Sequence, residues 1–152
     1  MKTRKIIGLI AICTLFMVSQ SCEKEGNEEK ISSSNSDESH NGGQNCMNCH
    51  VSGGDGEGWF QVAGTVYNEA LSSVYPNATL KLYSGPNGTG DLKHSVKVDD
   101  LGNFYSTETI TFGEGLYVGV QGTSTTKYMA SKVTSGQCNS CHGSSTAKIW
   151  TK

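Results

Sequence analysis

Between Trp59 and Val120 the sequence consists of short stretches in which apolar and polar residues alternate, separated by turn-forming residues. Alternation with a period of two predicts strands that bury one face. Residues 85–88 and 99–102 supply the Gly, Pro, Asn and Asp that tight turns need. No helix of convincing length is predicted. We therefore expect a mainly β fold, a small antiparallel β-sandwich, with strands at residues 60–67, 78–83, 92–98, 104–107 and 116–121.

The composition agrees with this fold class. The chain has 152 residues, 19 of them Gly and only 2 Pro, and 35% are hydrophobic. Gly is costly inside helices, so its abundance favours a turn-rich β domain over a helical bundle. A chain of this length holds one domain and a tail, and its core must be small.

Two pentapeptides flank the predicted sandwich: Cys-Met-Asn-Cys-His at residues 46–50, the first motif, and Cys-Asn-Ser-Cys-His at residues 138–142, the second motif. Cys-X-X-Cys-His is the pattern of covalent haem attachment. Two thiols one short loop apart add to the two haem vinyl groups, and the next residue presents an imidazole to iron. We expect two covalent haem c groups, with the porphyrins held by Cys46, Cys49, Cys138 and Cys141 and the irons bound by His50 and His142.

Other interpretations of the four cysteines remain open. They could hold one structural zinc, form disulfides, or act in thioredoxin-like redox chemistry. Neither zinc nor a disulfide accounts for a histidine directly after both pairs, and no βαβ pattern surrounds either motif. If Cys13 and Cys22 are assigned to an export signal and a lipid anchor, no cysteine is left outside the motifs. Haem is therefore the favoured interpretation.

Three residues are candidates for the sixth ligand of an iron. His40 precedes the first motif in a polar segment, where a solvated loop histidine is an equally good interpretation. His94 is in phase with apolar neighbours of a predicted strand, which favours a buried core histidine. Met129 precedes the second motif, where a thioether ligand would raise the reduction potential, although ordinary packing is the simpler interpretation.

The motifs resemble those of c-type cytochromes, and this likeness covers only the pentapeptides and their Gly-rich surroundings. The central stretch resembles carboxypeptidase-regulatory-like and collagen-adhesin B-type β-sandwiches. In those families the sandwich is usually a rigid spacer or a binding module, which implies a supporting role for the fold here. This second resemblance rests on residues 62–66, 77–82, 115–118 and on Asp99, Gly102 and Phe104.

The N-terminus has the pattern of an export signal: three basic residues within 1–5 and an apolar run over residues 6–18. Ser-Gln-Ser before Cys22 resembles the lipobox of bacterial lipoproteins, although the usual Leu is replaced by Ser19. We expect a signal peptide at residues 1–21 and acylation of Cys22, with a simple secretory leader as the alternative. Residues 22–44 are almost entirely polar and predict a disordered tether. The expected location is the outer membrane, on its periplasmic or outer face.

The remaining chain divides into a first haem-attachment segment (45–58), the sandwich (59–121) and a return segment (122–152) long enough to bring the second motif back beside the first. Removal of residues 1–21, which hold three basic and no acidic residues, leaves nine basic against fourteen acidic residues. This balance argues against nucleic acid and favours a basic redox partner.

The expected function is electron transfer to redox partner proteins or an extracellular acceptor by a membrane-tethered dihaem cytochrome that is not an enzyme. The alternatives are a non-redox surface lipoprotein that binds glycan or protein, and a haem enzyme such as a peroxidase. The enzyme is disfavoured because the chain shows no catalytic constellation beyond the haem ligands.

Overall fold

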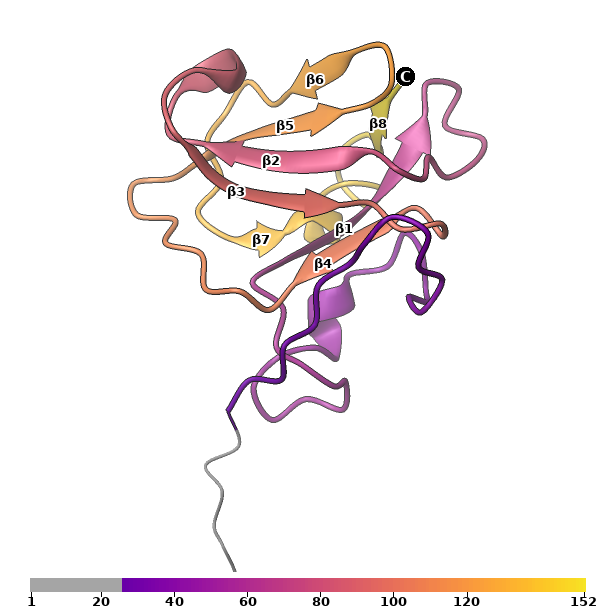
Figure 1. The fold of residues 1–152 in the computed structure, drawn as a ribbon, viewed down its shortest axis with the longest axis vertical. Coiled ribbons are helices and arrows are strands. Elements are labelled where there is room, and N and C mark those ends of the chain that lie inside the picture. The colour runs from indigo at the N-terminus through magenta and orange to yellow at the C-terminus, as the bar shows by residue number, and fades with distance from the viewer. Residues whose placement is uncertain (1–25) are drawn as a thin grey trace, which may run out of the picture.

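A computed structural model describes residues 26–152, so the predicted signal peptide and Cys22 lie outside the described residues. Two sheets face each other across an apolar core, which confirms the predicted mainly β sandwich (Figure 1). None of the helices in residues 26–152 is long and apolar enough to cross a membrane. The first sheet contains four strands: β4 (Asn103–Ser106), β1 (Val62–Asn68), β7 (Gly136–Gln137) and β8 (Ile149–Thr151). The second sheet contains the other four, in the order β3 (Leu92–Lys97), β2 (Thr79–Tyr83), β5 (Tyr117–Gln121) and β6 (Thr126–Tyr128).

The five strands predicted from alternation all form, with ends that differ by one or two residues. Their inward side chains make one core, in which Phe104, Leu80 and Val66 are completely buried. The predicted inward face of β3 is only partly right, because Val96 is buried while Leu92 at the strand end is 52% exposed. The helices of the described part are three short 3-10 turns: η1 (Cys46–Asn48), η2 (Pro86–Gly88) and η3 (Cys138–Ser140).

Strand β1 organises the region around both motifs. One edge of β1 pairs antiparallel with β4, and the other pairs in parallel with β7 at Val62–Ala63 and with β8 at residues 66–68. Residues 64–65 lie between these two short pairings, and η3 of the second motif packs against β1. The return segment therefore supplies β6, β7 and β8 to the sandwich, which differs from its predicted place outside it.

The predicted disordered tether is ordered over its described part. The main-chain groups of Lys30 and Ser32 exchange hydrogen bonds with residues 105–107, along the edge of β4 that β1 leaves open. The hydroxyl of Ser32 donates to the carbonyl of Lys97 at 2.6 Å and accepts from the main-chain N–H of Tyr105 at 2.9 Å. The prediction considered only apolar burial. Here the polar segment is ordered by its hydrogen bonds to the edge strand β4. By pairing there, the segment also covers the exposed edge of that strand.

His94 lies on β3, and its side chain is 8% exposed. Nδ1 lies 3.6 Å from the Glu108 carboxylate, and Nε2 is buried with no hydrogen-bond partner. Burial lowers the pKa of His94, and Glu108 opposes this shift only in part. The side chain is therefore buried as expected, but the hydrogen bonding expected of a core histidine is missing at Nε2 and His94 does not belong to the hydrophobic cluster.

We expect acid to destabilise the protein through His94. Because its pKa is lowered in the folded state, the unfolded chain binds a proton that the folded chain does not, and stability falls as pH drops below about 6.5. In urea unfolding, His94→Leu should lose less stability than the wild type between pH 7 and pH 5. Glu108→Gln, which removes the opposing charge, should lose more. An equal loss in all three proteins would exclude His94 as the cause.

Candidate functional site

The two motifs have the same local conformation although they lie far apart in the sequence. In each, the main-chain N–H groups of the second cysteine and of the histidine both donate to the carbonyl of the first cysteine. These distances are 3.2 and 3.0 Å in the first motif and 3.3 and 3.0 Å in the second. The second cysteines also share their dihedral angles, φ −113° and ψ −38° against φ −111° and ψ −49°. One short turn thus presents two thiols and an imidazole in the same way at both places.

Each motif histidine is oriented by a main-chain carbonyl. Nδ1 of His50 lies 2.8 Å from the carbonyl oxygen of Glu57, and Nδ1 of His142 lies 2.7 Å from that of Ala147. A carbonyl only accepts, so Nδ1 is the donor in each case, which leaves Nε2 as the nitrogen with the lone pair in the neutral form of the ring. This is the second-shell arrangement that holds metal-binding histidines in position.

Aromatic stacking further fixes the His50 ring. Phe60 stacks on it with ring centroids 4.1 Å apart and planes 11° apart, and Tyr105 stacks on Phe60 at 4.9 Å. Gly56 passes close behind the imidazole, since a Cβ there would lie 2.7 Å from Nδ1 of His50. The loop after the first motif therefore accepts only glycine at this position without displacing the ring.

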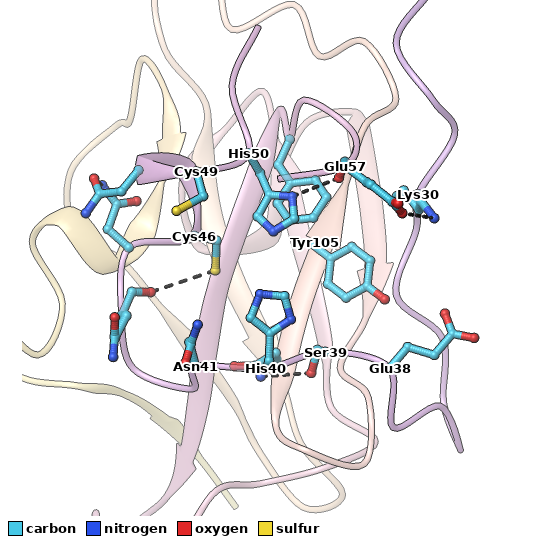
Figure 2. A pocket seen from close by; sticks show the side chains of 15 residues that line it. Lys30, Glu38, Ser39, His40, Asn41, Cys46, Cys49, His50, Glu57 and Tyr105 are labelled. Carbon is cyan, nitrogen blue, oxygen red and sulfur yellow. Dashed lines mark hydrogen bonds and ion pairs between the residues drawn. The ribbon is translucent and has the colours of Figure 1, made fainter. Parts of the chain in front are cut away.

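A first pocket of about 450 Å³ lies beside the first motif. Figure 2 shows His40 and His50 facing each other across it, with Cys46 and Cys49 to one side and Tyr105 to the other. The two imidazole centroids are 5.8 Å apart and their planes are tilted by 38°. The volume lies in the range of sites for organic cofactors.

A second pocket of about 490 Å³ lies beside the second motif. It is lined by residues of both sheets, among them Val118 of β5 and Ile149 of β8, together with both cysteines and the histidine of the motif. Met129 lines the same pocket. Each motif therefore has its own cavity of similar size, and the first of them is lined in part by β4.

Asn139, the second residue of the second motif, connects the two motifs. Its amide donates to the carbonyl of Gln44, next to the first motif, at 3.0 Å and to the hydroxyl of Thr65 at 3.1 Å. Its carbonyl accepts from the main-chain N–H of Thr65 at 3.2 Å. Gly64 allows this close approach, because a Cβ there would lie 3.0 Å from the Cβ of Cys138. The expected adjacency of the two motifs is thus seen in the structure.

The four cysteines of the described part are free thiols. Burial, and secondarily the neighbouring Cys46, raise the pKa of Cys138 to about 12, and burial also raises the pKa of Cys46. In residues 26–152 no three His, Cys, Asp or Glu side chains are grouped to hold a metal ion.

The structure separates the three candidates for a sixth ligand. His40 lies in the first pocket and Met129 in the second, whereas His94 lines neither. Sequence reasoning did not single out Asn139, which is a variable position of the motif, or the three lysines that line the second pocket. Those lysines are dispersed in the sequence, so no local signal could have grouped them: Lys127, Lys132 and Lys148.

Comparison with known proteins found no protein family, characterised protein or solved structure that matches this chain.

Proposed function

We propose that this chain is a dihaem c-type cytochrome lipoprotein that transfers electrons and is not an enzyme. One observation carries the proposal: two Cys-X-X-Cys-His motifs have the same turn, each orients its histidine through a Nδ1 hydrogen bond to a carbonyl, and each adjoins its own cavity. A pentapeptide that occurs by chance is not expected to show this set of features twice in one chain.

The residues present fit the cofactor. Cys46 and Cys49 would hold the first porphyrin, with His50 as the iron ligand; in the second motif Cys138, Cys141 and His142 would take the same roles. A bound haem would supply reversible one-electron chemistry at its iron. The chain orients each imidazole through Nδ1, and aromatic and aliphatic side chains form part of the pocket walls.

The proposed location and partners are based on the sequence alone. We propose acylation of Cys22 as the membrane anchor, at the outer membrane, with residues 26–44 lying along the domain instead of forming a long free linker. The partners would be redox proteins or an extracellular electron acceptor, and no basic surface for nucleic acid is expected from the net acidic charge.

Haem content tests this function. Protein produced together with a c-type haem-attachment system is expected to carry two covalent haems per chain, as measured by intact mass and by a pyridine haemochrome assay. The matched control replaces all four motif cysteines by serine and should carry none. Stoichiometric zinc with no covalent haem, or a mass showing two disulfides, would refute the proposal and favour a non-redox surface lipoprotein.

A further inference from the structure

We propose that His40 and Met129 are the sixth iron ligands of the first and second sites, respectively, and that the second site has the higher reduction potential. This inference rests on the proposed haem function and deepens it. These different ligands would give the two sites unequal reduction potentials, so electrons would reside preferentially at the second site.

The chain presents His40 to the first pocket from an anchored loop. On one side the side-chain amide of Asn103 donates to the Ser39 hydroxyl at 2.9 Å, and on the other the main-chain N–H of Gly43 donates to Thr65 at 2.7 Å. The His40 ring between these anchors faces His50 (Figure 2). Metal–imidazole bonds are about 2 Å long, so the 5.8 Å between the two ring centroids is close to the separation that two imidazoles bound to one metal ion require.

Met129 is the only methionine that lines the second pocket. Its main-chain N–H donates to the carbonyl of Val118 at 2.9 Å, which holds the residue beside β5. Its half-buried side chain lines the pocket together with His142, and His142 is the only histidine in that lining. A thioether is a soft ligand that favours the reduced iron, so His/Met coordination raises the potential above that of His/His coordination.

The charges around the pockets act in the same direction. Three lysines and no Asp or Glu line the second pocket. Each ammonium group lies over an aromatic ring: Lys127 over Trp150 at 4.1 Å, Lys148 over Tyr67 at 4.0 Å and Lys132 over Tyr117 at 5.9 Å.

The first pocket has a different balance of positive and negative charges. Its one lysine, Lys30, is paired with Glu28 and Glu57, and Glu38 also lines it. Positive charge near an iron disfavours the more positive oxidised state, so the lysines should raise the potential of the second site further.

A potentiometric titration of the dihaem protein, followed by absorption and electron paramagnetic resonance spectra, tests the inference. Two separate one-electron waves are expected, and the higher one should belong to the haem that shows the charge-transfer band of methionine-ligated ferric iron. Met129→His should remove that band and lower only the higher wave, whereas His40→Met should raise only the lower wave. Met129→Leu, a gentler change, should convert one haem alone to a spectrum without a methionine ligand.

Control variants separate ligation from charge and from general damage. His94→Leu replaces a histidine that lines neither pocket, and should leave both waves in place. Replacing the three lysines of the second pocket by glutamine should lower the higher wave without changing its ligand spectrum. Two haems of equal potential, or a higher wave unaffected by both Met129 variants, would overturn the inference. Loss of covalent haem in the wild type would instead refute the proposed function.

Discussion

The double variant Cys46→Ser, Cys49→Ser is expected to retain one covalent haem, and the double variant Cys138→Ser, Cys141→Ser the other. The two pockets share no lining residue, so each site should form without its partner. Intact mass gives the stoichiometry, and the spectrum of each variant identifies the haem that remains. Only the variant that retains the second motif should show methionine ligation.

Loss of both haems from either variant would contradict this independence. The structural contact that could transmit such damage is Asn139, which bonds to Gln44 beside the first motif and to Thr65 of β1. Asn139→Ala is therefore the informative control, because it removes the connection while keeping all four cysteines. Each buried group left unpaired there costs about 1–3 kcal/mol. If this variant carries two haems, the connection serves stability and not attachment.

Phe104→Ala is expected to lower the free energy of unfolding by about 3–5 kcal/mol. The ring is completely buried in the single core, and its tip lies 2.6 Å from the position that a Cβ on Gly64 would occupy. Natural domains are stable by about 5–15 kcal/mol, so this loss is a large fraction of the total stability. Urea unfolding measures the change.

Leu101→Ala is the matched control for this substitution. Leu101 belongs to the turn before β4 and is 41% exposed, so its truncation should change stability by less than about 0.5 kcal/mol. A loss below about 1 kcal/mol for Phe104→Ala would mean that the core closes around the missing ring, contrary to the packing described above.

The sequence was sufficient for those features that depend on neighbouring residues. Alternation along each stretch specifies which face of a strand is buried, and the five predicted strands form at those places. Tight turns depend on local dihedral preferences: Asn87 and Gly102 both adopt positive φ in the two predicted turns. The chemistry of the motifs is also local, because two thiols and an imidazole must lie within five consecutive residues.

Features that depend on distant partners could not be predicted in the same way. Strands β6, β7 and β8 have only two or three residues, too few for a periodic pattern, and they form because β1 and β5 offer open edges. The polar segment before the first motif is ordered by the open edge of β4, a partner about 75 residues away.

Which candidate ligand lies at which site also depends on contacts between distant residues. The sequence does not predict which of its four histidines face each other, nor that three lysines far apart in the chain line one pocket. Hydrogen bonding and packing across the folded chain bring His40 to the first motif and Met129 to the second, while His94 is buried elsewhere. Local chemistry thus identifies the two attachment motifs, whereas long-range contacts determine the surroundings that make them different.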